Sequence, residues 1–264
     1  MGFIQFDKMD LKNQGLLPEY ALELFLDHNP QDPNSALRIS ERVEKIRSKY
    51  DTEEYKTEIP HRLKERDHFA IPRIQDHPRY GDVINSINEL TRFLDAGCGC
   101  GWDLRRVIKD GLRIENAKGI DIKQLYRRIN FELYRDEEIM GPVFEIGDAL
   151  STRFRSSSFD IIHSGSVIHA LEKKDVALKY IKEMRRILKL NGIFFGKTLG
   201  CDSERETKRP YRVFITTLDK LDEYFGREGF KEIDIQLEDF EKKYNKPKKY
   251  PDQPSYMLHF YAMS

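Results

Sequence analysis

The stretch FLDAGCGCGWDL, residues 93–104, decides how the rest of this chain is interpreted. A short apolar run contains Asp95, and three glycines then follow at alternate positions before a segment with helical spacing. Glycine lets the backbone adopt conformations that other residues avoid, and it lets a ligand approach closely. A strand, a glycine-rich turn and a helix in this order are typical of nucleotide-binding sites in α/β proteins.

On the carboxyl side of this stretch, short apolar runs alternate with amphipathic segments. Strands are predicted at 92–97, 117–122, 143–149, 159–166, 192–200, 231–240 and 256–264. Helices are predicted at 103–111, 123–139, 174–190 and 217–230. Alternating strands and helices form a mostly parallel sheet covered on both faces, and right-handed crossovers make it doubly wound. We therefore predict a seven-stranded, Rossmann-like α/β fold that binds ligands at the carboxyl ends of its strands.

The first 90 residues have a different pattern and are predicted to be mainly helical. Candidate helices lie at 18–28, 34–50, 59–74 and 80–93, with prolines between them. Such a segment cannot form a sheet core, so we expect a helical cap over 1–90 and a ligand-binding domain over 91–264. Some aromatic residues of this cap are candidates for lining an apolar pocket, or for packing against their own helices. They are Tyr50, Tyr55, Phe69 and Tyr80.

The spacing of the glycines selects among nucleotide ligands. A dinucleotide fingerprint needs glycine or alanine where Trp102 stands, and Asp95 would repel a pyrophosphate. Two unit charges about 4 Å apart interact by about 4 kcal/mol at an effective dielectric near 20, so the sign of this interaction matters. S-adenosylmethionine carries an ammonium and a sulfonium but no phosphate, and it is the predicted cofactor. Trp102 and Tyr126 are candidates for packing against it, or for packing within the fold.

Further residues stand where this cofactor needs partners. Asp121 ends the second predicted strand and is suited to accept hydrogen bonds from both ribose hydroxyls, and Ile122 follows it. Asp148, after the third predicted strand, is a candidate acceptor for the adenine amino group, with Ala149 beside the ring. The predicted cofactor-binding residues are Asp95, Gly97, Gly99, Asp121, Ile122, Asp148, Ala149 and Ser164.

Several motifs in order give the chain a family resemblance. With GID at 119–121, GDA at 147–149, FDIIHS at 159–164 and LNGIFF at 190–195, the glycine turn resembles that of class I S-adenosylmethionine-dependent methyltransferases. The segments GWDLRRVIKDG, FELYRDEE, FDIIHSGSVIHAL and FFGKTLG are similar to methyltransferases of fungal natural-product clusters, notably those of meroterpenoids. This resemblance implies O-methylation of a small molecule, often of a carboxylate on a polyketide or terpenoid scaffold. Lys197 departs from the pattern, in which arginine is common.

A few polar residues are candidates for contact with the acceptor. His169 follows the fourth predicted strand and is the leading candidate for an orienting group or a general base, ahead of His163. Lys197 and Arg212, together with Arg209, are candidates for pairing with an anionic acceptor. Methylation of nitrogen or carbon, and a methyltransferase-like regulator of secondary metabolism without turnover, are the alternative interpretations.

Composition limits the classes of partner. Lys plus Arg and Asp plus Glu number 45 each, and this balance argues against nucleic-acid or anionic-membrane binding, so RNA methylation is the least favoured activity. No apolar run approaches the roughly 20 residues that span a bilayer, and the N-terminus lacks a signal-peptide pattern. We expect a cytoplasmic protein with a small-molecule substrate, and a homodimer is compatible with the sequence. Three cysteines make neither a disulfide framework nor a zinc site, so no metal is expected.

Overall fold

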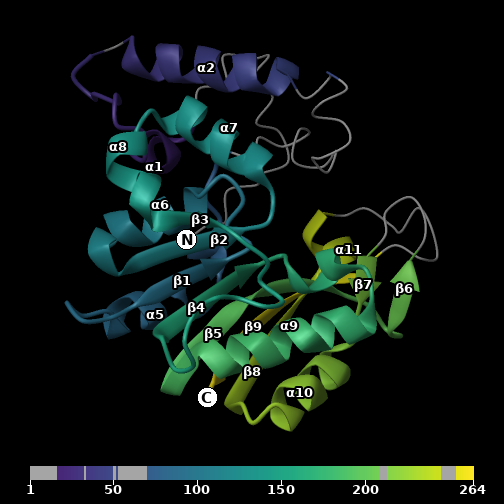
Figure 1. Cartoon of the computed structure of the whole chain (residues 1–264). Helices are drawn as coiled ribbons and strands as arrows, with labels where there is room; N and C mark the ends of the chain where they lie inside the picture. The colour runs from purple at the N-terminus through teal and green to yellow at the C-terminus, as the bar shows by residue number, and fades with distance from the viewer. Residues whose placement is uncertain (1–16, 33, 50–51, 53–69, 208–212, 245–253) are drawn as a thin grey trace.

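A single sheet of seven strands forms the centre of the molecule (Figure 1). A computed structural model describes residues 17–32, 34–49, 52, 70–207, 213–244 and 254–264. The strands of the sheet are β1 Phe93–Ala96, β2 Ala117–Asp121, β3 Phe144–Ile146, β4 Phe159–Gly165, β5 Leu188–Gly200, β8 Lys231–Asp239 and β9 Tyr256–Met263. Their order is β3-β2-β1-β4-β5-β9-β8, and only β9 runs antiparallel to its neighbours. The predicted seven-stranded, mostly parallel sheet is confirmed.

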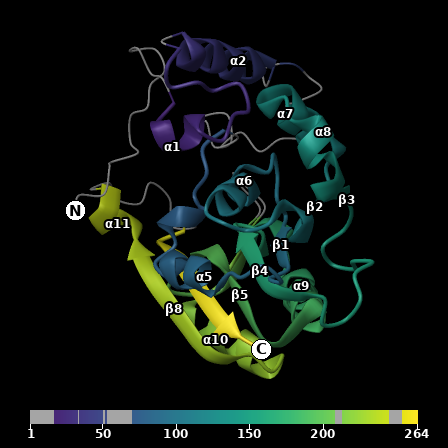
Figure 2. The same cartoon turned by 90° about the vertical axis from the view of Figure 1, so that its left-hand side faces the viewer.

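Helices cover both faces of this sheet (Figures 1 and 2). They are α5 Tyr80–Ser86, α6 Trp102–Lys109, α7 Gln124–Tyr134, α8 Glu137–Met140, α9 Lys174–Ile187, α10 Leu218–Arg227 and α11 Phe240–Tyr244. Short 3-10 turns are η3 Ile74–Asp76, η4 Ile114–Asn116, η5 Gly141–Val143 and η6 Ile168–Leu171. Alternate strand residues point to opposite faces, so Phe194 packs with α9 and α10 while Phe195 packs with α5, α6 and α8.

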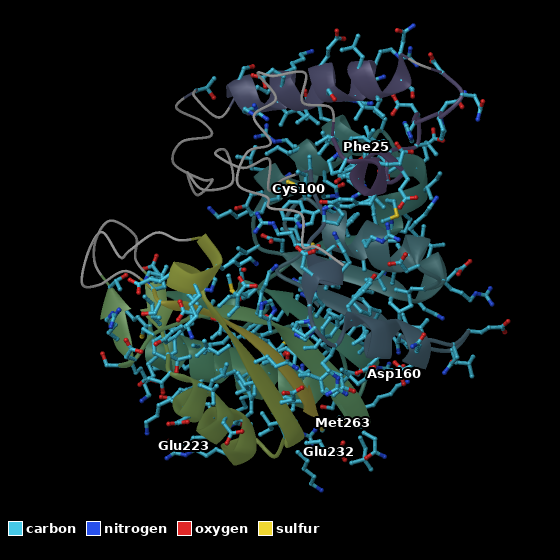
Figure 3. All side chains as sticks on the ribbon, turned by 180° about the vertical axis from the view of Figure 1, so that it is seen from behind. Phe25, Cys100, Asp160, Glu223, Glu232 and Met263 are labelled. Carbon is cyan, nitrogen blue, oxygen red and sulfur yellow. The ribbon has the colours of Figure 1, made fainter. Side chains whose placement is uncertain are left out.

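The described N-terminal helices α1 Glu19–Leu22 and α2 Ser35–Lys49 lie beside α7 (Figure 1). Phe25 and Cys100, both labelled in Figure 3, belong to the apolar cluster that joins these helices to α7. Ion pairs from Arg106 to Glu23 at 2.5 Å and from Lys49 to Glu132 reinforce the contact. The predicted helices at 18–28 and 34–50 are therefore present, although α1 is a single turn.

Residues 70–90 were predicted to be part of the helical cap, but their described elements pack differently from α1 and α2. The 59–74 candidate lies largely outside the described residues, but η3 and α5 are described and contribute Ile74, Tyr80 and Val83 to the cluster that contains Phe93 of β1. These two elements therefore pack against the sheet.

Two further departures from the predictions have local causes. The helix predicted to reach residue 190 ends at Ile187, because Leu188 has extended ψ and pairs with Phe159 at the start of β4. A hairpin of β6 Arg205–Thr207 and β7 Val213–Ile215 was not predicted, since three-residue strands carry little periodic signal. Among the described residues, no helix is both long and apolar enough to cross a membrane.

Candidate active site

The glycine turn after β1 needs glycine for two separate reasons. Gly97, Gly99 and Gly101 have φ of +76°, +52° and +72°, in the left-handed region that side chains disfavour. A Cβ on Gly97 would lie 2.3 Å from Cγ2 of Val167, and one on Gly101 would lie 2.3 Å from Cζ of Phe144. Conformation and space therefore both exclude larger residues, as the spacing of the glycines predicted.

Asp121, at the carboxyl end of β2, is bonded directly to this turn. Its Oδ2 accepts a hydrogen bond from the N–H of Gly99 at 2.9 Å, and its Oδ1 accepts one from the N–H of Lys123 at 2.9 Å. Burial raises the pKa of Asp121, although these two donors oppose the rise. Each carboxylate oxygen has a second lone pair. Asp121 therefore suits the predicted pairing with two ribose hydroxyls.

Apolar and acidic groups flank Asp121. Ile122 is 64% exposed and Ile146, at the end of β3, is 45% exposed. Asp148 is exposed, and its Oδ1 accepts a hydrogen bond from the N–H of Leu150 at 2.8 Å. Ala149 packs partly against the α9 face of the core. An apolar surface next to a hydrogen-bond acceptor fits an adenine, so these residues agree with the cofactor predicted from the sequence.

Asp95 has a partner that the sequence did not reveal. It lies opposite His163 in the β1–β4 register, and Nδ1 of His163 donates to its Oδ1 at 2.8 Å. Both side chains are only 3% exposed. Burial raises the pKa of Asp95, and His163 opposes that rise. Asp95 thus joins β1 to β4 below the turn, and its contact with a cofactor stays a prediction.

Three other candidates are engaged inside the fold. Ser164 is fully buried, and its hydroxyl accepts a hydrogen bond from the hydroxyl of Tyr180 in α9 at 2.8 Å, while its contact with a cofactor stays a prediction. Tyr126 is buried in the cluster shared by α1, α2 and α7. Trp102 packs against that cluster, and its ring lies beside Gly99.

His169, in η6, is oriented by strand β5. Its Nδ1 accepts a hydrogen bond from the N–H of Leu199 at 3.2 Å and lies 3.3 Å from Oγ1 of Thr198. A neutral imidazole that accepts at Nδ1 carries its proton at Nε2. His169 is therefore arranged to donate from Nε2, which favours an orienting group over a general base.

Lys197 lies near the carboxyl end of β5, in register with Gly165 of β4. It is half-buried, and within the described part of the chain no carboxylate forms an ion pair with its ammonium. Burial, and next the charge of Arg73, lower the pKa of Lys197 to about 8. An ammonium in this position attracts an anion. The companion candidates Arg209 and Arg212 lie outside the described residues, as do Tyr50, Tyr55 and Phe69.

The segment around η3 lies beside this site, and the sequence did not predict that it would. Oδ1 of Asp103 accepts hydrogen bonds from the N–H groups of Arg73 at 2.6 Å and Ile74 at 2.9 Å. Nε2 of His77 donates to the carbonyl of Phe260 in β9 at 3.1 Å. The segment is thereby held across β9 and the start of α6. An acidic residue in the first turn of α6 was the only available signal.

Tyr80, the remaining aromatic candidate, has a structural role. Its hydroxyl donates to Oδ2 of Asp110, the residue that follows the C-terminal end of α6, at 2.6 Å. No group of three or more His, Cys, Asp or Glu side chains is arranged to hold a metal ion among the residues that the structure describes.

Comparison with known proteins agrees with this geometry. Residues 94–196 match the family model described as a methyltransferase domain. The match, the strand order and the glycine turn define a class I methyltransferase domain, a class whose cofactor is S-adenosylmethionine. Within that class, the expected resemblance to methyltransferases of fungal natural-product clusters is confirmed by the relatives that follow.

The chain is 28% identical over 153 residues to O-methyltransferase phiE of Fungal sp. (strain ATCC 74256), covering 55% of this chain and 51% of that protein. It is 27% identical over 157 residues to Asnovolin E/Chermesin D methyltransferase nvfJ of Aspergillus novofumigatus (strain IBT 16806), covering 58% and 54%. The chain thus spans about half the length of the curated relatives it matches.

A solved structure shares the same fold. It is the phosphoethanolamine N-methyltransferase 2 of Haemonchus contortus in complex with S-adenosyl-L-methionine, with a TM-score of 0.58 and 17% identity over 83% of this chain and 59% of that one.

Proposed function

We propose that this protein transfers a methyl group from S-adenosylmethionine to the carboxylate of a small organic acid. The domain match supports methyl transfer. The choice of a carboxylate is carried by one observation, the half-buried ammonium of Lys197 without an ion-pair partner in the described chain, near the carboxyl end of β5.

The residues around the glycine turn would hold the cofactor. The backbone of Gly97 and Gly99 would contact it closely, Asp121 would accept from the ribose hydroxyls, and Asp148 and Ile122 would face the adenine. When bound, S-adenosylmethionine supplies a methyl group on a positively charged sulfur, and its transfer to a carboxylate yields a methyl ester and S-adenosylhomocysteine.

The acceptor side of the site provides orientation and needs no base. A carboxyl group with a pKa near 4 is already ionised at neutral pH. Lys197 would draw that anion to the ends of β4 and β5, and His169 would donate to it from Nε2. Placing an ionised acceptor correctly supplies most of the rate enhancement that such a displacement requires.

A two-stage experiment tests this proposal. Calorimetry first measures the binding of S-adenosylmethionine to the full chain. Carboxylic acids of polyketide and terpenoid type, and their methyl esters as controls, are then incubated with protein and cofactor and analysed by mass spectrometry. We expect a gain of one methyl group on an acid and none on its ester. Methylation of the esters would contradict the carboxylate proposal, and cofactor binding without turnover of any acid would favour a regulator.

Lys197→Met provides the matched variant. It should retain the affinity for S-adenosylmethionine and lose about tenfold or more in kcat/KM for the acid, since a charge-assisted contact contributes about 1.5–3 kcal/mol. In the unchanged protein, acceptor affinity should fall as the pH rises through about 8, because Lys197 then loses its charge. Unchanged acid turnover in the variant would refute the role of Lys197.

A further inference from the structure

A small cavity lies beside Asp121, the residue that ends β2. Its volume is about 10 Å³, which is enough for about one water-sized group. Gly99 of the glycine turn, Asp121 itself and Asn130 of α7 line this cavity, and so does Ile146 at the end of β3. The cavity therefore adjoins the carboxylate that is proposed to accept hydrogen bonds from the ribose of the cofactor.

Asn130 brings a buried amide to the wall of this cavity. Its side chain is fully buried, and among the described residues neither Nδ2 nor Oδ1 has a hydrogen-bond partner. An amide that is withdrawn from water without partners is destabilising, and buried polar groups are almost always hydrogen-bonded. Because the cavity lies against Asn130, a group from outside the chain can supply a partner there.

The other described side chains on the cavity wall do not share this need. Lys123 and Arg127 also carry donors, but both are half-buried, so water satisfies them whether or not a ligand is bound. Glu145 is exposed and offers no donor, and Cys98 offers only a thiol, which is a weak one. Among these lining side chains, Asn130 is the strong donor that depends on a group inside the cavity.

We infer that Asn130 recognises the ribose of the cofactor together with Asp121. One ribose hydroxyl would enter the cavity, donate to the carboxylate of Asp121 and accept from Nδ2 of Asn130. A carboxylate only accepts, so a hydroxyl that donates to Asp121 keeps lone pairs that need a donor, and the amide supplies it. A deoxyribose would leave the amide unpaired. The inference rests on the proposed function, since it takes Asp121 as the ribose acceptor.

Calorimetry tests this inference without requiring turnover. The full chain is titrated with S-adenosylhomocysteine and with its 2′-deoxy and 3′-deoxy analogues. The unchanged protein should bind S-adenosylhomocysteine about tenfold or more tightly than at least one analogue, because sites that hydrogen-bond a hydroxyl discriminate against analogues lacking it. The analogue with the weaker binding identifies the hydroxyl that enters the cavity.

Asn130→Leu assigns this preference to the amide, since leucine has the same number of side-chain heavy atoms and no polar group. The variant should bind S-adenosylhomocysteine about three- to tenfold more weakly, which is the usual effect of losing one neutral hydrogen bond. Its affinity for the analogue that lacks the recognised hydroxyl should not change. Its free energy of unfolding without ligand should not fall, because the amide has no internal partner to lose; a purely structural role would lower it.

Two control variants match Asn130 in different respects. Tyr134→Phe removes another buried and unpartnered polar group from α7, but Tyr134 does not belong to the described lining of the cavity. Arg127→Leu removes a donor that does line the cavity but also reaches water. Neither variant should change the preference for the hydroxyl by more than about twofold.

A crystal structure of the unchanged protein with S-adenosylhomocysteine tests the contact directly, even if Asn130→Leu does not fold. A ribose oxygen should lie within about 3.2 Å of Nδ2 of Asn130. A water molecule at that position, with both ribose hydroxyls elsewhere, would overturn the inference.

The binding outcomes separate this inference from the proposed function. Failure of S-adenosylhomocysteine to bind would overturn the proposed function itself. If it binds, then equal affinity of the unchanged protein for all three compounds would overturn the inference alone. A hydroxyl preference that survives Asn130→Leu, or one that Arg127→Leu abolishes, would do the same.

Discussion

Acid should destabilise this protein through His77. Burial, followed by the neighbouring His259 and His163, lowers the pKa of His77 from 6.5 to about 3. The ring is 6% exposed, and it donates from Nε2 to the carbonyl of Phe260 while Nδ1 accepts from the N–H of Arg79. The folded protein therefore requires the neutral ring. In the unfolded chain the same group has its ordinary pKa near 6.5.

The sign and size of the effect follow from proton linkage. Between about pH 6.5 and pH 3 the unfolded chain binds a proton that the folded chain excludes, so stability is full above pH 7 and is lost as the pH falls. With pKa values of 6.5 and about 3, the loss attributable to His77 is about 2 kcal/mol at pH 5 and about 4 kcal/mol at pH 3. These losses are large against the 5–15 kcal/mol that typically separates folded from unfolded domains.

Urea unfolding followed by circular dichroism at pH 8 and pH 5 measures this contribution. The comparison is between the unchanged protein and His77→Gln, whose amide can still donate to Phe260 but does not titrate. The variant should be less stable at pH 8, because packing around the ring is disturbed. It should lose about 2 kcal/mol less on moving to pH 5. The same pH dependence in both proteins would refute the assignment to His77.

Three further predictions concern the glycine turn and its neighbours. Asp121→Asn should weaken S-adenosylmethionine binding by about 10- to 100-fold in calorimetry, since charge-assisted hydrogen bonds contribute about 1.5–3 kcal/mol; unchanged affinity would contradict the ribose assignment. Gly97→Ala should lower the free energy of unfolding. Adding Val167→Ala should restore only part of the lost stability, because the left-handed φ of +76° still costs about 1–2 kcal/mol. Full recovery would show that the backbone conformation contributes nothing to the loss. His169→Asn, which can retain an acceptor for Leu199, should reduce kcat for an acid by less than about 100-fold, whereas loss of a true base costs about 10²–10⁴-fold.

The parts of this site that sequence could predict are local along the chain. The glycine turn and Asp121 follow directly from strand ends, because the residues that end parallel strands share one edge of the sheet. The pairing of Asp95 with His163 could not be predicted in the same way, since the two residues lie 68 positions apart and meet only through the β1–β4 register. Sequence located the acid correctly but not its partner.

The surroundings of Lys197 show the same limit. Its place on the fifth predicted strand was clear, but its lowered pKa depends on burial and then on the charge of Arg73, which contacts between the η3 segment and two other elements bring near. Periodicity also failed at Leu188, where the helical pattern continues but pairing with β4 provides better backbone partners. In both cases the outcome depends on tertiary contacts that the local sequence does not contain.

The packing of the N-terminal helices bears on how an acceptor enters. Lifting α1 and α2 away from α7 would expose apolar side chains such as Phe25, Ile39 and Val43, which are at most 3% exposed. Fully burying each such side chain contributes about 1.5–3 kcal/mol, so separating the whole cluster would consume most of the stability of a typical domain. We therefore expect α1, α2 and α7 to stay together during turnover.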